Sequence, residues 1–210
     1  MSRLYLTSEV QYVASSLKTK LADVSLLPAV FITTPINDKP HSDLSWHHRN
    51  RVSLENLGFS FDFYNIANKT NDQIVGDLAR YAVMYVEGGN SYYLLQEAQK
   101  NGFGELVAKK VKEGMVYIGT SAGSVIVGPD IEPVRREETT PLAPELKGTK
   151  AFGIVPFVVM PHWGDPNRRA LYNDYRMEHI YHEDYPYVFI SNNQYVEVVE
   201  GSWKIITVKN

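Results

Sequence analysis

Residues 115–124 read MVYIGTSAGS, and this stretch decides how the chain folds. Its first four residues are apolar and of types that favour β-structure, which predicts a buried strand. Gly119 and Gly123 then bracket Ser121 in the pattern G-x-S-x-G, typical of a sharp turn from a strand into a helix. Such a turn lifts the hydroxyl beside the amides that begin the helix, where negative charge is stabilised. The stretch predicts a serine nucleophile; the structural alternatives are a small-residue turn and a phosphate-binding loop.

Short apolar segments alternate with helical patterns on both sides of this stretch. Strands are expected at residues 4–8, 28–33, 59–66, 82–86, 154–160 and 187–190, and helices at 8–21, 42–57, 71–80, 91–100, 105–112 and 167–182. This alternation predicts right-handed crossovers and a mostly parallel sheet covered on both faces. A β-hairpin is expected from segments 195–199 and 203–208. We predict an α/β fold, a three-layer αβα sandwich that forms a single catalytic domain over residues 1–210.

The composition argues against several classes of function. A chain of 210 residues can bury a full core, and its net charge of −3 gives no general attraction to nucleic acids or anionic membranes. Cysteine is absent, which excludes disulfides and a cysteine nucleophile. The sequence shows no signal-peptide pattern and no stretch long enough to span a membrane. We expect a cytoplasmic protein, a monomer or homodimer, without nucleic-acid or membrane partners.

One segment lacks any periodic pattern. Residues 128–149 contain four prolines and a mixed cluster of charges. An irregular loop of this length inside a domain is usually a functional lid or a disordered excursion.

A serine nucleophile needs a base, and His162 is the candidate. It follows the expected strand at 154–160, at the edge of a parallel sheet where Ser121 would also emerge. The other histidines are expected at the surface: His41, His47, His48, His179 and His182. The last two lie one helical turn apart and could bind a metal, but no third ligand is indicated. No metal site is therefore predicted.

The segment Gly88-Gly89-Asn90 also ends an expected strand and begins a helix. Glycines at this position let backbone amides approach a substrate oxyanion, so the amides of Gly89 and Ala122 could form an oxyanion hole. The alternative is a simple turn into a helix that Asn90 or Ser91 caps.

Three segments together carry a family resemblance: residues 88–95 (GGNSYYLL), 117–124 (YIGTSAGS) and 161–163 (PHW). They resemble the peptidase E (aspartyl dipeptidase, S51) family, which includes cyanophycinases and has the class I glutamine amidotransferase-like, flavodoxin-like fold. The resemblance implies Ser121 as nucleophile and His162 as base. It also implies an oxyanion hole at Gly89 and Ala122, a small peptide substrate and no cofactor.

The sequence departs from the family pattern after the histidine. Family members carry an acidic residue in the strand-end segment that orients the imidazole, and Asn192 stands there in this chain. An amide can hold the tautomer but cannot offset the charge of an imidazolium. We therefore hypothesise a Ser-His dyad in which Asn192 is at most an orienting residue.

A second departure concerns substrate binding. Aspartyl dipeptidases have an acidic residue after the serine that binds the free amino terminus of the substrate. Here Arg136 stands in the direct register, and Glu137 and Glu138 are displaced. An arginine would suit a substrate carboxylate, whereas a glutamate would suit an amine. These three residues, with Gly88 and Asn90, are the candidate substrate-binding residues, and cleavage of Asp-X dipeptides is left open.

Two other functions remain compatible with the sequence. An α/β-hydrolase esterase uses the same serine turn, and Asp174 with His179 or His182 would follow its chain order. All three residues fall on one expected helix, which is a poor position for a catalytic histidine that comes from a late loop. Alternatively, an amidotransferase-like fold without its triad acid could serve as a non-catalytic binding protein.

Overall fold

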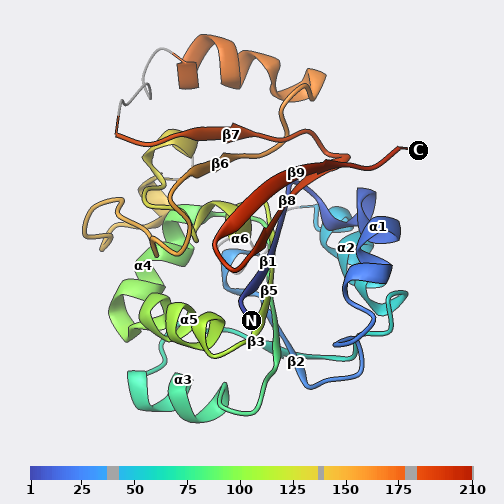
Figure 1. Ribbon diagram of the computed structural model, residues 1–210. Helices are drawn as coiled ribbons and strands as arrows, with labels where there is room; N and C mark the ends of the chain where they lie inside the picture. The colour runs from blue at the N-terminus through green and yellow to red at the C-terminus, as the bar shows by residue number, and fades with distance from the viewer. Residues whose placement is uncertain (37–42, 137–139, 178–183, 210) are drawn as a thin grey trace.

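The central sheet of the computed structural model, which describes residues 1–36, 43–136, 140–177 and 184–209, has seven strands in the order β3-β2-β4-β5-β1-β8-β9 (Figure 1). The strands are β1 Arg3–Thr7, β2 Ala29–Ile32, β3 Phe61–Tyr64, β4 Val83–Val86, β5 Val116–Thr120, β8 Gln194–Val199 and β9 Ser202–Thr207. The first five strands of this order run parallel to one another. β8 pairs antiparallel with β1, and β9 pairs antiparallel with β8. The α/β fold with a mostly parallel sheet and a C-terminal hairpin is confirmed.

Helices cover both faces of this sheet. Figure 1 shows α1 and α2 on one side and α4, α5 and α6 on the other. The helices are α1 Ala14–Lys20, α2 Ser45–Glu55, α3 Asn71–Asp77, α4 Ser91–Asn101, α5 Phe103–Lys112 and α6 Ala122–Val125. Shorter 3₁₀ turns lie at Val10–Tyr12, Thr34–Ile36, Glu132–Val134, Thr140–Leu142 and Pro166–Arg168, and a π-helix at Leu171–Arg176. None of the helices in the described ranges is long and apolar enough to cross a bilayer.

The alternation of side chains along the strands produces two hydrophobic cores. Tyr5, Tyr85 and Ile118 are paired neighbours on β1, β4 and β5, and all three are buried beneath α1 and α2. Leu4 and Tyr117 on the opposite pleats are buried in the core on the α4–α6 side. The central strands are thus apolar on both faces, and β5 delivers the serine turn from the middle of the sheet.

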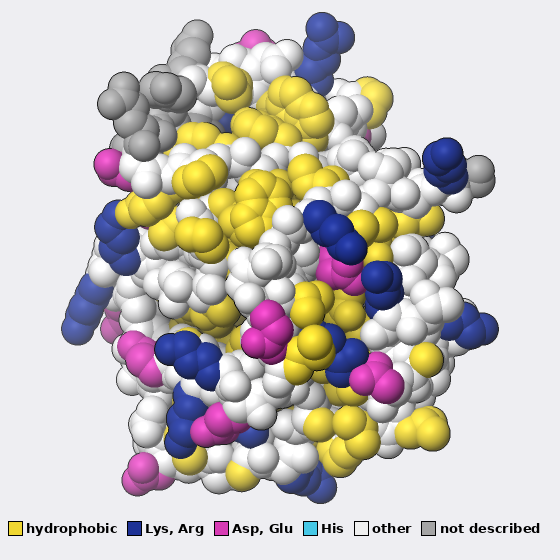
Figure 2. Space-filling model, viewed as in Figure 1, with side chains coloured by type: hydrophobic (Ala, Val, Ile, Leu, Met, Phe, Trp, Pro, Cys, Tyr) yellow, Lys and Arg dark blue, Asp and Glu magenta, His cyan; other side chains and the backbone are white. Residues whose placement is uncertain are grey.

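The C-terminal hairpin closes one edge of the sheet. Its two-residue loop places Glu200 and Gly201 at φ 50° and 78°, as a type I′ turn requires. On the outer strand β9, Trp203 is 44% and Ile205 is 43% exposed. Figure 2 shows apolar side chains gathered over the upper half of the side of the molecule in view, where β6, β7 and β9 lie in Figure 1.

The strand that precedes His162 does not belong to the central sheet, so the expectation of one shared sheet edge is wrong. β6 Val158–Met160 pairs in parallel with β7 Tyr187–Phe189 in a separate two-stranded sheet. The edge of β1 that a further parallel strand would use is occupied by β8. β6 instead packs against α6, directly over the serine turn.

Three other segments differ from the expected pattern. The helix expected at 8–21 begins as a 3₁₀ turn and becomes α-helical only at Ala14, and Ser8 does not cap it. The helix expected at 167–182 contains the π-helix, and residues 178–183 lie outside the described part. The 128–149 segment is partly structured: it holds two 3₁₀ turns and a β-bridge between Asp130 and Lys150.

Candidate active site

The serine turn is strained and tightly packed. Ser121 has φ 48° and ψ −106°, a conformation that L-residues rarely adopt and that is typical of a nucleophile elbow. A Cβ at Gly123 would lie 2.1 Å from the backbone oxygen of Val86 on β4, so only glycine fits there. The Tyr117 hydroxyl donates to the Gly123 carbonyl at 2.7 Å and holds the first turn of α6 in place.

His162 lies in the turn after β6 and is held by its backbone. Its φ of 64° is in the left-handed region, and its amide donates to the Ser8 hydroxyl at 2.9 Å. Ser8 is buried at the end of β1 and donates in turn to the carbonyl of Ile190 at 3.0 Å. The next amide, that of Trp163, also donates to Ile190. These bonds fix the imidazole above the central sheet although its own strand lies outside that sheet.

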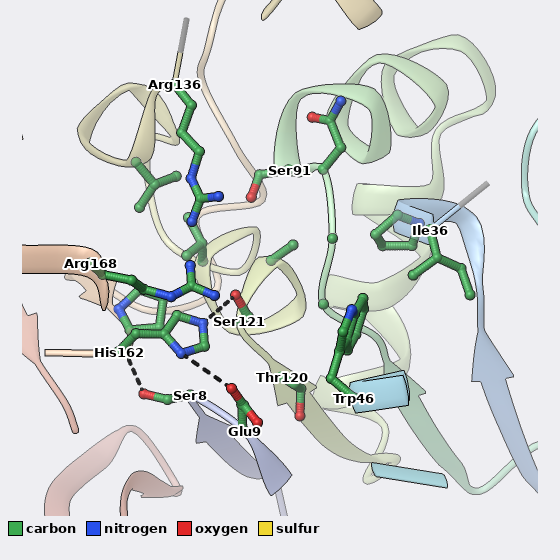
Figure 3. A pocket seen from close by; sticks show the side chains of 18 of the residues that line it. Ser8, Glu9, Ile36, Trp46, Ser91, Thr120, Ser121, Arg136, His162 and Arg168 are labelled. Carbon is green, nitrogen blue, oxygen red and sulfur yellow. Dashed lines mark hydrogen bonds and ion pairs between the residues drawn. The ribbon is translucent and has the colours of Figure 1, made fainter. Parts of the chain in front are cut away.

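The structure brings Ser121, His162 and Asn192 together. His162 Nε2 lies 3.0 Å from the Ser121 hydroxyl, and its Nδ1 lies 3.0 Å from the amide oxygen of Asn192 (Figure 3 shows the contact with Ser121). Because an amide oxygen can only accept, Nδ1 carries the proton. Nε2 then presents its lone pair to the hydroxyl, which is the arrangement that removes a proton from a serine.

The surroundings of His162 favour its neutral form. Its side chain is 4% exposed, and burial, the positive charge of Arg168 and then those of Arg136 and Arg176 lower its pKa to about 3, against the opposing effect of the bond to Asn192. The imidazole is therefore unprotonated and able to accept a proton throughout the neutral range. An imidazolium formed at this place would be destabilised by the same charges.

A cavity of about 290 Å³ opens in front of the serine. Figure 3 shows Arg136 and Arg168 on its His162 side and Trp46 on the opposite side. Arg176 also lines it. The volume lies at the small end of the range for ligand sites, and the arginines give it positive charge, which suits a small ligand with a carboxylate.

The Gly88-Gly89-Asn90 segment lines the same cavity, as does Ala122. Gly89 has φ 132°, and a Cβ there would lie 2.3 Å from the carbonyl oxygen of Pro35, so the backbone passes too close for any side chain. The side-chain oxygen of Asn90 caps α4 by accepting from the amides of residues 92 and 93, which is the alternative expected from the sequence. An oxyanion hole at Gly89 and Ala122 stays a prediction.

Among the other residues considered from the sequence, one more lines the cavity and several lie in segments that the structure does not describe. Arg136 lines the cavity. Glu137, Glu138, His41, His179 and His182 lie outside the described residues. Within the ranges that are described, no three His, Cys, Asp or Glu residues are grouped closely enough to hold a metal ion.

His48 is exposed as expected, but the expectation of a solvated face at His47 is wrong. His47 Nδ1 lies 2.8 Å from a carboxylate oxygen of the fully buried Glu87, and its ring packs edge-on against Phe31. Glu87 also accepts from the amide of Gly88 at 2.8 Å. The pair therefore supports the glycine turn that borders the cavity.

Sequence reasoning missed several residues of the site: Ser8, Glu9, Trp46, Arg168 and Arg176. A signal existed for the first two, because Ser8 ends and Glu9 follows a strand expected in the parallel sheet, so both should lie at its carboxyl edge. The helical pattern after them instead suggested a helix cap. No local pattern marks Trp46 or the arginines, which reach the cavity from separate segments.

Comparison with known proteins gives consistent matches. The family model for peptidase family S51 matches residues 7–206. An uncharacterized peptidase of Listeria monocytogenes is 33% identical over 115 residues, which cover 55% of this chain and 56% of that protein. Peptidase E of Streptomyces coelicolor is 32% identical over 123 residues, covering 57% and 46%. The chain thus spans about half the length of the curated relatives it matches.

Solved structures share the fold along the whole chain. The crystal structure of a candidate peptidase E protein from Listeria monocytogenes EGD-e has a TM-score of 0.87 and 24% identity and covers all of both chains. That of a peptidase from an acI-B1 actinobacterium has a TM-score of 0.72 and 17% identity, covering 99% of this chain and 88% of that one. At these identities the likeness concerns the fold.

Proposed function

Because the chain belongs to peptidase family S51, a family of serine hydrolases, we propose that it hydrolyses short peptides through an acyl-enzyme on Ser121. The observation that carries this proposal is the 3.0 Å separation between Ser121 Oγ and His162 Nε2 inside the cavity. A strained serine with a neutral imidazole in hydrogen-bond reach is the arrangement that nucleophilic acyl transfer requires.

The reaction would proceed in two stages. Ser121 Oγ attacks the peptide carbonyl while its proton passes to His162 Nε2, and the amides of Gly89 and Ala122 receive the oxyanion. The proton then passes to the leaving amine as the C–N bond breaks. Water repeats the sequence on the acyl-enzyme and releases the acid. Asn192 accepts from Nδ1 throughout and keeps the imidazole in the tautomer that this scheme needs.

The substrate would be small and would carry a carboxylate. Arg136 and Arg168 enter the cavity from the side of His162, and a guanidinium pairs well with a carboxylate. The volume of about 290 Å³ suits a dipeptide better than a folded protein. We propose a peptide that presents an acidic side chain next to the scissile bond, bound within a single catalytic domain formed by residues 1–210.

A panel of substrates tests this function. Dipeptides with an acidic or a neutral first residue, amino-acid anilides and p-nitrophenyl esters are incubated with the protein and with Ser121→Ala, and the products are separated chromatographically. We expect cleavage of acidic dipeptides that is lost in Ser121→Ala, and a raised KM in Arg136→Gln. Absence of peptide cleavage, or cleavage that persists in Ser121→Ala, would refute the proposal.

A non-catalytic binding protein is the second candidate, because the position of the family's acidic residue holds the neutral Asn192. Under that reading the cavity binds acidic peptides without cleaving them. The esterase alternative has less support, since Asp174 is exposed and does not line the cavity, and its partners His179 and His182 lie outside the described residues. Ester cleavage without any peptide cleavage in the same panel would favour it.

A further inference from the structure

A carboxylate that the proposed mechanism does not use faces the base. Glu9 Oε1 lies 3.8 Å from His162 Nδ1, the ring nitrogen that also contacts Asn192, and the pair is marked in Figure 3. The Glu9 side chain is 18% exposed and borders the cavity. It comes two residues after β1, next to Ser8, whose hydroxyl holds the amide of His162.

The position of this carboxylate is fixed by its neighbours. Gln11 Nε2 donates to Glu9 Oε2, so one carboxylate oxygen is held while the other faces His162. The side-chain oxygen of Gln11 in turn accepts from Arg49 Nε at 3.0 Å. A hydrogen-bonded chain thus runs from the surface of α2 through Gln11 to Glu9, and it keeps Glu9 beside the imidazole.

The chemistry of the base needs such a charge. When Ser121 attacks, its proton moves to Nε2 and the ring becomes an imidazolium. Around the ring, Arg136, Arg168 and Arg176 all oppose this charge, and Asn192 is neutral. Among the described residues, Glu9 is the acidic group that lies within ion-pair distance of the ring, at 3.8 Å, and an opposite charge at this range favours the charged form of an imidazole.

We propose that Glu9 is the acidic partner of His162, a positioning residue that takes the part of the carboxylate missing at Asn192. Glu9 exchanges no proton: the proton of Ser121 passes to His162 Nε2 and then to the leaving amine, while Asn192 and Glu9 both face the Nδ1 side. Asn192 sets the orientation of the ring and Glu9 supplies the charge. This inference rests on the proposed function, and its test must therefore report on Ser121 separately.

The experiment measures how fast a fluorophosphonate labels the protein at pH 7.5, with intact-protein mass spectrometry as the readout. Labelling needs the nucleophile and its base but no knowledge of the peptide substrate. The proteins are the wild type, Ser121→Ala, Glu9→Gln, the double variant Glu9→Gln/Asn192→Asp, and Glu55→Gln as the matched control. Glu55 is exposed at the end of α2, where it pairs with Arg51.

Glu9→Gln keeps the size of the side chain and an oxygen that can accept from Gln11, so a loss of rate reports the loss of charge. We expect it to slow labelling at least tenfold while its thermal unfolding stays close to that of the wild type. Adding Asn192→Asp places a carboxylate at His162 Nδ1 from position 192 instead of position 9. It should restore the labelling rate to within a few-fold of the wild-type rate. Glu55→Gln should label as the wild type does.

The outcomes separate the two proposals. If the wild type is not labelled, or Ser121→Ala is labelled equally, the proposed function fails. If the wild type is labelled at Ser121 and Glu9→Gln matches its rate, only the role of Glu9 is overturned. A slow Glu9→Gln that Asn192→Asp does not rescue would also overturn it, because a structural defect at position 9 would not be repaired by an acid at position 192.

Discussion

The buried imidazole of His162 makes the stability of the fold depend on pH in a way that can be isolated. In the folded chain its pKa is lowered to about 3 by burial and by Arg168, whereas the unfolded chain keeps the ordinary value of 6.5. Between these values the unfolded state binds one more proton than the folded state, so acid favours unfolding. The contribution of His162 is fully present above pH 6.5 and is lost as the pH falls toward 3.

The magnitude follows from the two pKa values. One proton changes the free energy of unfolding by about 1.4 kcal/mol for each pH unit within this window. Roughly 1.5 units of the interval from pH 7 to pH 5 lie below the unfolded-state pKa, so the loss is about 2 kcal/mol. This figure hardly depends on the folded-state pKa of His162, because pH 5 lies well above it.

Urea unfolding of the wild type and of His162→Gln at pH 7 and pH 5 measures this contribution. Both chains carry the same other titratable groups, so those contributions cancel when the two pH-dependent losses are subtracted. We expect the wild type to lose about 2 kcal/mol more than His162→Gln between the two pH values. Equal losses in the two chains would show that the imidazole is protonated in the folded state at pH 5, and the reasoning about its surroundings would be refuted.

Five further substitutions, at four positions, probe the framework of the site. Ser8→Ala removes the acceptor of the buried His162 amide and should lower the free energy of unfolding by about 1–3 kcal/mol in urea titrations. Gly123→Ala forces a methyl group against a β4 carbonyl oxygen and should cost more than about 3 kcal/mol, whereas Gly76→Ala in α3 meets nothing within 4 Å and should stabilise by up to about 1 kcal/mol. Asn192→Ala should lower kcat about tenfold with little change in KM. Asn192→Glu, which keeps an acceptor for Nδ1, should have a kcat close to that of the wild type.

Each of these has a result that would contradict it. A wild-type stability for Ser8→Ala would mean that the His162 amide finds another partner. Equal stability of the two glycine variants would show that the serine turn is not closely packed. If neither Asn192 variant changes the rate of peptide hydrolysis, Asn192 has no orienting role.

The features that short sequence patterns encode could be predicted from the sequence. The G-x-S-x-G pattern needs glycine at Gly123 because a β4 carbonyl passes 2.1 Å from where a Cβ would stand, and the strained Ser121 lies at its centre. Residues 194–207 form the expected hairpin, since the loop residues Glu200 and Gly201 accept positive φ. These conformational requirements concern residues that are close in the sequence, so the residue types at those positions indicate them.

The features that depend on distant contacts could not be predicted. β6 has only three residues, and no pattern in it says that it pairs with β7 instead of entering the central sheet. His47 sits among polar residues in the sequence, yet folding places it against the buried Glu87. Glu9 begins a helical pattern in the sequence, which gives no sign of a contact with His162. The two side chains meet because Ser8, the neighbour of Glu9, binds the backbone amide of His162.

The most direct measurement of the central claim is a crystal structure of the protein after fluorophosphonate treatment. If Ser121 is the nucleophile and His162 its base, the phosphorus is bonded to Ser121 Oγ. Its oxygen then accepts hydrogen bonds from the amides of Gly89 and Ala122. Phosphorus on any other residue, or a phosphonyl oxygen that points away from both amides, would contradict the account.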